Sequence, residues 1–185
     1  NFNTAIFTNL SRDHLDYHKN FKNYLNSKLI LFRKLLSKNG TIIFDKQIKE
    51  KSLFKSIVKK RKLQSLTIGK SSNLEIKKHI FVKDTQLLSL KFNNKDYSFR
   101  TNLIGKIQLK NLLMAVLAAS KILKFDNIVN ILSKIKPIKG RLEQLSKLKD
   151  NSRIILDYAH TPDALETSIQ DIQEQFKFSK ISIVF

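Results

Sequence analysis

Cysteine is absent from this 185-residue sequence, which also has no tryptophan, only two prolines and only four glycines. The absence of cysteine excludes disulfides, thiolate zinc sites and cysteine nucleophiles, and it agrees with a reducing, cytoplasmic compartment. No run of eighteen apolar residues occurs, so we expect no transmembrane helix and no membrane partner. The first residues, NFNTAIF, lack the basic and apolar regions of a signal peptide. Because the only methionine is Met114, we expect that residue 1 is not the natural start of the protein.

Acidic residues are also scarce, since 15 Asp and Glu stand against 35 Lys and Arg, for a net charge of +20. A basic surface of this kind neutralises phosphates, so a basic nucleic-acid-binding module is one alternative function. Only six of the basic residues are arginine, however, and arginine is the usual reader of bases and phosphates. Lysine is spread over the whole length, together with many Ile and Asn residues. We interpret this bias as drift under an AT-rich codon supply and expect no nucleic-acid partner.

The order of apolar segments predicts an α/β protein, because runs of strand length alternate with segments of helical periodicity. Strands are expected at 2–8, 41–44, 65–68, 74–82, 87–92, 97–103 and 153–157, and a last parallel strand at 181–185. Helices are expected from 21 to a closing Asn39-Gly40 pair, and at 48–60, 109–123, 126–133 and 161–176. Asn93-Asn94 indicates a hairpin turn. Thr161 and Pro162 are typical of a helix N-cap and first helical position.

The segment from Lys136 to Gly140 is the best candidate for a domain boundary. It contains one of the two prolines and one of the four glycines. We therefore expect a first domain at 1–136 and the beginning of a second, truncated domain at 137–185.

Two polar clusters, TNLSRDHLDYH at 8–18 and DYAHTPDAL at 157–165, each follow a predicted strand and precede a predicted helix. At that position open α/β sheets usually bind ligands, and the helix N-terminus favours anions such as phosphate. A binding role is therefore expected for Asp157 or His160. The sequence contains neither a G-x-S-x-G elbow nor a G-x-x-x-x-G-K-[ST] loop, so a serine hydrolase is disfavoured and the chain has no nucleotide P-loop of its own.

Two kinds of side chain near the first cluster could carry chemistry. His14 and His18, with two nearby aspartates, are suitable metal ligands, although hydrogen-bonding or capping roles remain open for them. Lys28 lies on the apolar face of the first predicted helix. Either its aliphatic stem is buried while the ammonium reaches water, or partial burial lowers its pKa and favours nucleophilic or carbamylation chemistry.

Four stretches, in this order, resemble the Mur ligase family: TNLSRDHLDYH, the helix of Lys28, GRLEQL at 140–145 and DYAHTPDAL. The last two favour the branch that adds the third amino acid to the peptidoglycan precursor over the folylpolyglutamate-synthase-like ligases, which share the architecture. The resemblance implies that 1–136 is the later part of a central ATPase domain, a parallel sheet with flanking helices plus a small antiparallel β region. It implies that 137–185 begins a Rossmann-like C-terminal domain. The P-loop would then precede Asn1, and the part that selects the amino acid would follow Phe185.

The resemblance also implies roles for individual residues. His14 would be a ligand of the second Mg²⁺, and Lys28 would be carbamylated and would help to hold that metal. Asn9 and Arg12 would line the phosphate and metal region. On the nucleotide and inter-domain side the implied residues are Gln108 and Asn111 at the adenine, Arg141 at the phosphates, Asp157 at the ribose and His160 near the active site.

One position departs from the family pattern G-x-F/H-N-x-x-N. The segment from Gly105 to Asn111 reads GKIQLKN, so Ile107 replaces the aromatic or histidine residue and Gln108 replaces the first asparagine. The longer side chain of Gln108 puts its contact with adenine in question.

The activity implied by the resemblance is an ATP-dependent ligation through an acyl phosphate. ATP would phosphorylate the D-Glu side-chain carboxylate of UDP-MurNAc-L-Ala-D-Glu, the amine of free diaminopimelate or lysine would attack, and phosphate would leave. ATP and Mg²⁺ are the implied cofactors, and a monomer is expected. Without a P-loop, the fragment is not expected to turn over ATP alone.

Overall fold

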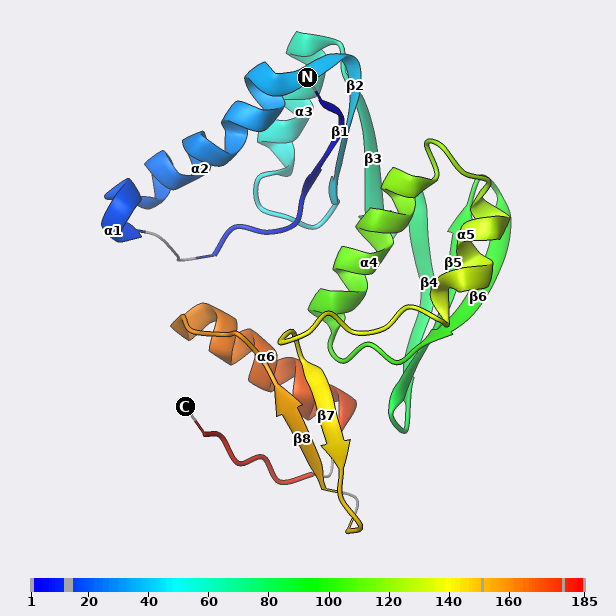
Figure 1. The fold of residues 1–185 in the computed structure, drawn as a ribbon. Coiled ribbons are helices and arrows are strands. Elements are labelled where there is room, and N and C mark those ends of the chain that lie inside the picture. Colours follow the sequence, from blue (N-terminus) through cyan, green and yellow to red (C-terminus); the bar gives the residue numbers. More distant parts are fainter. Residues whose placement is uncertain (1, 12–14, 151, 178, 185) are drawn as a thin grey trace.

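The computed structural model describes residues 2–11, 15–150, 152–177 and 179–184, and it has the α/β architecture expected from the sequence (Figure 1). A six-stranded sheet with the order β1-β2-β3-β4-β5-β6 forms the larger part, and β7 and β8 form a separate two-stranded sheet. The strands are β1 Phe2–Phe7, β2 Leu36–Asp45, β3 Gln64–Gly69, β4 Leu74–Val82, β5 Thr85–Phe92, β6 Lys95–Thr101, β7 Glu143–Lys147 and β8 Arg153–Leu156. The helices are α1 Leu15–His18, α2 Phe21–Ile30, α3 Lys51–Arg61, α4 Lys106–Ala119, α5 Phe125–Leu132 and α6 Pro162–Gln175.

The large sheet is mixed, since β1 to β4 pair in parallel and β4 to β6 pair antiparallel. The predicted turn at Asn93-Asn94 joins β5 to β6. Both asparagines have positive φ, 48° and 63°, as a two-residue hairpin turn with the right-handed strand twist requires. This part of the fold follows directly from local sequence.

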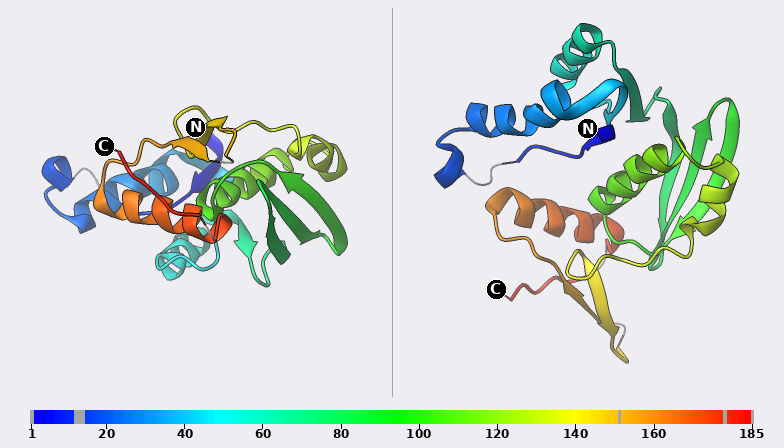
Figure 2. Two further views of the ribbon diagram at one scale, coloured as in Figure 1. Left: turned by 90° about the horizontal axis from the view of Figure 1, so that it is seen from below. Right: turned by 45° about the horizontal axis from the view of Figure 1, so that its top comes forward.

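The sheet separates two apolar cores, and strand β2 contributes to both. Ile43 packs under α4 with Leu113, whereas its neighbours Ile42 and Phe44 pack on the other face, with α2 and α3. This is the two-residue alternation of a strand that is buried on both faces. Helix α4 therefore covers one face of the sheet while α2 and α3 cover the other (Figures 1 and 2).

The first predicted helix ends earlier than expected, and the Asn39-Gly40 pair does not close it. Helix α2 ends at Ile30, a π-helical turn (η1, Leu31–Leu35) follows, and β2 begins at Leu36. The pair lies within β2 instead, where the pairing with β1 shifts register. Pairing with a distant strand overrides the local helix-stop signal, and Asn39 adopts a φ of 60° in the resulting bulge.

Arg61, the last residue of α3, holds the end of this helical segment in place. Its guanidinium donates to the carbonyl oxygens of Phe32 and Leu36, both at 2.8 Å. The last carbonyls of a helix have no partner within the helix, and an arginine from another element can satisfy them. The side chain of Arg61 therefore ties α3 to η1 and to the beginning of β2, which follow the helix of Lys28.

The C-terminal part differs from the expectation in two respects. Strand β8 pairs antiparallel with β7, a strand that the sequence analysis did not predict, and residues 181–184 form no strand. A strand needs a neighbouring strand for its backbone hydrogen bonds. Val184 is 97% exposed, so no neighbouring strand among the described residues covers this segment. Helix α6 begins as predicted, because the Thr161 side chain accepts a hydrogen bond from the amide of Ala164 and Pro162 is the first helical residue. Among the described residues, no helix is long and apolar enough to cross a membrane.

The β7–β8 sheet also contacts the tip of the β4–β5 hairpin. Asp84 in that hairpin pairs with Arg153 and accepts a hydrogen bond from Lys147 at 3.1 Å. Partial burial raises the pKa of Asp84, but the bonds from Arg153 and Lys147 outweigh that effect, so the pKa lies below its usual 3.8.

Because the pKa of Asp84 is lower in the folded state, its stabilising contribution is present above pH 3.8 and disappears as the pH falls through the folded pKa. We expect Asp84→Asn to lower the free energy of unfolding by up to about 1 kcal/mol at neutral pH, since the pair is partly exposed. The difference should be smaller at about pH 2, because that pH lies below the unfolded pKa of the carboxyl. Urea denaturation of both proteins at the two pH values measures it. Equal stability at neutral pH would contradict the pairing, and Asp96→Asn, an exposed change in β6, is the control.

Candidate functional site

The carboxyl ends of β1 and β2 present polar side chains at one edge of the sheet, which is where open α/β sheets place ligand sites. Thr8 and Asn9 follow β1, and they line a cavity of about 400 Å³ together with Lys28 of α2. The Lys28 side chain is half-buried, and its Nζ lies 4.8 Å from the centroid of the Tyr24 ring. The structure therefore brings two of the predicted residues, Asn9 and Lys28, to one cavity.

The other two residues predicted for this region, Arg12 and His14, lie outside the described residues. Among the residues that are described, no group of three or more His, Cys, Asp or Glu side chains could hold a metal. The predicted metal site uses His14, which lies outside the described residues, and a modified lysine, Lys28. It therefore stays a prediction. His18, the other histidine of the cluster, stacks on Tyr24, and its Nδ1 lies 3.4 Å from the Ser27 hydroxyl.

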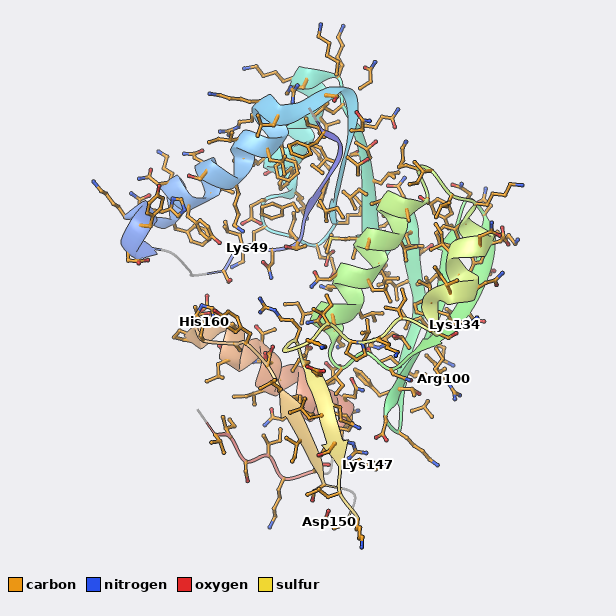
Figure 3. The ribbon with its side chains drawn as sticks, in the orientation of Figure 1. Lys49, Arg100, Lys134, Lys147, Asp150 and His160 are labelled. Carbon is orange, nitrogen blue, oxygen red and sulfur yellow. The ribbon has the colours of Figure 1, made fainter. Side chains whose placement is uncertain are left out.

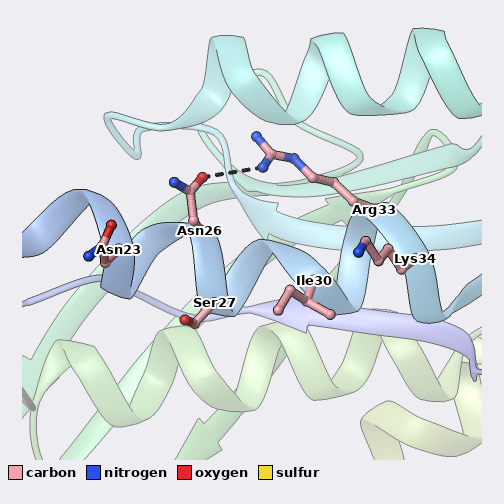
Figure 4. Close-up of a pocket in the computed structure, with 6 residues that line it drawn as sticks. All are labelled: Asn23, Asn26, Ser27, Ile30, Arg33 and Lys34. Atoms are coloured by element: carbon pink, nitrogen blue, oxygen red, sulfur yellow. Dashed lines mark hydrogen bonds between the residues drawn. The ribbon is translucent and has the colours of Figure 1, made fainter. Parts of the chain in front are cut away.

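A second hollow, of about 410 Å³, lies on the surface of α2 and η1 (Figure 4). Its lining includes Asn26 and Arg33, which are joined by a hydrogen bond of 3.3 Å. None of the residues predicted for binding or catalysis lines it, and we assign it no role.

Asp45 ends β2 at the same sheet edge, and the sequence analysis did not single it out. The residue is 3% exposed, its Oδ1 accepts from the amide of Gln47 at 2.9 Å, and its Oδ2 lies 2.7 Å from Nζ of Lys110. A buried carboxylate of this kind needs both a counter-charge and hydrogen bonds. The pair connects the sheet edge to the first turns of α4. A carboxylate directly after an apolar strand was the available signal.

Gln108 and Asn111 lie on the first turns of α4, on either side of Lys110. Their spacing of three residues places them on neighbouring positions of one helix face, and both side chains are half-buried. The departure at Ile107 and Gln108 therefore changes side chains at the beginning of α4 without disturbing the helix.

The predicted residues of the C-terminal part lie together around Asp157. Its Oδ1 accepts from the amides of Leu142 and Tyr158, at 3.3 and 2.9 Å, and its Oδ2 accepts from the hydroxyl of Ser168. The Arg141 guanidinium lies 5.1 Å from the centroid of the Tyr158 ring. The GRLEQL and DYAHTPDAL stretches thus meet in space, and they hold Asp157 in a fixed orientation.

His160 lies at the start of α6 and is exposed (Figure 3). Its Nδ1 is 2.9 Å from the carbonyl oxygen of Tyr158, and the two rings are 4.9 Å apart. Such a carbonyl contact orients the imidazole and leaves Nε2 for another group.

Comparison with known proteins identifies the family of the chain. The family model described as Mur ligase middle domain matches residues 1–119, more than half of the sequence. The chain belongs to the Mur ligase family. The UDP-N-acetylmuramoyl-L-alanyl-D-glutamate--2,6-diaminopimelate ligase of Rickettsia conorii is 40% identical over 185 residues, which cover 99% of this chain and 38% of that protein. The Mur ligase chain therefore spans under two fifths of the length of this relative.

Solved structures show that the Mur ligase fold extends through most of the chain. MurF from Acinetobacter baumannii matches with a TM-score of 0.80 and 19% identity, covering 94% of this chain and 38% of that one. The MurF ligase of Thermotoga maritima in complex with ADP matches with a TM-score of 0.75 and 16% identity, covering 93% of this chain and 39% of that one. At these identities the likeness concerns the fold.

Proposed function

We propose that this chain is part of an ATP-dependent ligase of peptidoglycan precursor synthesis that joins an amino acid to UDP-MurNAc-L-Ala-D-Glu. The main observation in support is the 40% identity, over 99% of the chain, to a protein named as the diaminopimelate ligase. The name of that relative favours diaminopimelate over lysine as the added residue. We expect the ligase to act in the cytoplasm, as a monomer, with residues 1–136 in the ATPase domain and 137–185 in the C-terminal domain.

In this proposal Lys28 and Asn9 serve the metal and phosphate region. A carbamate forms when the neutral amine of Lys28 attacks carbon dioxide and loses a proton, and it presents carboxylate-like oxygens, which Mg²⁺ prefers. The imidazole of His14 would be the second protein ligand, a borderline nitrogen donor beside the hard carbamate oxygens, and the side chain of Asn9 would line the same phosphate and metal region. When bound, Mg²⁺ would offset the negative charge of the transferred phosphoryl group. The carbamate is an anion, so Lys28 would have to leave its position over the Tyr24 ring.

The remaining residues would bind ATP and align the reacting groups. Gln108 and Asn111 would contact adenine from α4, and Asp157 would accept hydrogen bonds from the ribose. Arg141 would pair with the phosphates, where a guanidinium can bind two oxygens at once. His160 would lie near the reacting groups, with Nδ1 held at the carbonyl of Tyr158.

A chimeric ligase tests the proposal, because the chain has no P-loop of its own. The segment of the Rickettsia conorii enzyme that aligns with this chain is replaced by residues 1–185. We expect the chimera to join diaminopimelate to UDP-MurNAc-L-Ala-D-Glu with consumption of ATP, as followed by chromatography of the product. The 185-residue chain alone should give no product. A chimera that is folded, as judged by circular dichroism, but inactive would overturn the proposal. Ligation by the 185-residue chain alone would show that the chain is a complete active site rather than a part of one.

Bound folate instead of the UDP-sugar would favour the folylpolyglutamate-synthase-like alternative. A gel shift of the chain with DNA or RNA that weakens steeply with salt would favour the nucleic-acid-binding module.

A further inference from the structure

Helix α6 turns a polar face toward the rest of the molecule. Ser168, Asp171 and Gln175 follow the i, i+3, i+7 spacing of one helix face. Asp171 and Gln175 are only 7% and 6% exposed, although aspartate and glutamine usually lie at the surface. Buried polar groups of this kind need hydrogen-bond partners.

The partners of these two side chains are backbone groups at the start of α4. The carboxylate of Asp171 accepts from the amide of Ile107 at 3.0 Å, and the side-chain oxygen of Gln175 accepts from the amide of Gly105 at 3.0 Å. The first amides of a helix have no partner within the helix, and Gly105 has no side chain to cap them. Helix α6 thus supplies the missing cap from 64 and 70 residues away. The right-hand view of Figure 2 shows the end of α6 beside the start of α4.

Gly105 is suited to this contact by its size and its conformation. A Cβ at this position would lie 2.5 Å from Oδ2 of Asp171, and its φ of 82° disfavours other residues. From β5, the side-chain nitrogen Nε2 of Gln86 donates to the carbonyl oxygens of Leu103 and Gly105, at 2.7 and 3.1 Å. The chain that enters α4 is therefore held from two directions.

The same face of α6 also holds the Asp157 cluster, because the hydroxyl of Ser168 donates to the carboxylate of Asp157. One rigid helix thereby contacts both the beginning of α4 and the loop of Asp157. We propose that α6 is a bracket, in which Asp171 and Gln175 are positioning residues that fix Gln108 and Asn111 relative to Asp157. The bracket rests on the proposed function for its purpose, since it would align the adenine and ribose sides of one nucleotide site.

Because the chain has no cysteine, a pair of spin labels can measure the bracket directly. Labels on Ile122→Cys, after α4, and Glu166→Cys, on α6, lie at exposed positions outside the contact. We expect one narrow distance in the labelled chain and a broad distribution after Asp171→Ala or Gln175→Ala. Asp171→Asn keeps an acceptor oxygen and should restore the narrow distance. Glu174→Gln, which weakens only the exposed pair with Lys106, should leave it unchanged.

A narrow distance in both alanine variants, with the helical circular dichroism retained, would overturn the bracket. If Asp171→Ala unfolds the chain, the spin-label distances in Gln175→Ala and Asp171→Asn test the bracket instead. In the chimeric ligase we expect Asp171→Ala to raise the KM for ATP by roughly 5- to 10-fold, the lower range of coupling between sites, with partial recovery in Asp171→Asn. A broadened distance with an unchanged KM would overturn the positioning role. An inactive parent chimera would instead overturn the proposed function, while the distances still judge the bracket.

Discussion

Replacing Lys28 by alanine in the chimeric ligase is expected to lower kcat by at least about 100-fold, the loss typical of removing one group that stabilises transition-state charge. The reason is its position: Lys28 is half-buried and lines the same cavity as Asn9, at the carboxyl end of β1. No other lysine lines this cavity among the described residues. The rate of product formation at saturating ATP and substrates measures the effect.

Lys22→Ala, an exposed change on the same helix, is the matched control and should leave kcat unchanged. If the carbamate forms, short carboxylates such as acetate should restore part of the activity of Lys28→Ala, and carbon-13 bicarbonate should give a carbamate resonance that this variant lacks. Full activity of Lys28→Ala would remove the residue from the mechanism. Loss of activity without either carbamate signature would leave Lys28 essential as a cation.

Replacing Phe54 by alanine is expected to have the largest effect on stability, a loss of about 3–5 kcal/mol in the free energy of unfolding. Phe54 is fully buried, and the centroid of its ring lies 4.8 to 5.2 Å from the ring centroids of Phe7, Phe32 and Phe44. The cavity left behind would lie between α3, η1 and the sheet. Since small domains have only about 5–15 kcal/mol of stability in total, Phe54→Ala should remove a large fraction of the stability of the chain.

Urea denaturation followed by circular dichroism measures the effect of Phe54→Ala. Phe21→Ala is the matched control, because Phe21 is 42% exposed at the start of α2 and should cost less than about 1 kcal/mol. Similar losses in the two variants would show that the aromatic cluster is not the centre of this core.

Features that depend on neighbouring residues could be predicted from the sequence. Asn93-Asn94 and Thr161-Pro162 have conformations set by three or four residues, and both predictions are confirmed. Asn39-Gly40 carries the same kind of local signal, but pairing with β1 places it inside a strand. The parallel strand expected at 181–185 was wrong for a similar reason, since apolar residues alone do not supply a pairing partner.

The polar contacts of the candidate site depend on partners far away in the sequence. Asp45 pairs with Lys110 on α4, and Asp171 binds the amide of Ile107, 64 residues earlier. Periodicity marks Asp171 as one more polar residue of an amphipathic helix and says nothing of its burial. The resemblance to the Mur ligases named Asn9, Lys28 and Asp157, but it gave no reason to single out these two aspartates.

The bulge in β2 has a consequence for how the gene can vary. Phe2 pairs with Leu36 and Thr4 with Thr41, so one residue of β1 faces the four residues 37–40 of β2. A residue added within 37–39 would lengthen an excursion that is already out of register, and the pairs from Thr41 onward would keep their places. A residue added between Ile42 and Ile43 would instead exchange the faces of the following side chains and present each core with the residues of the other. Insertions and deletions in related genes should therefore accumulate at 37–39 and be absent between Ile42 and Ile43.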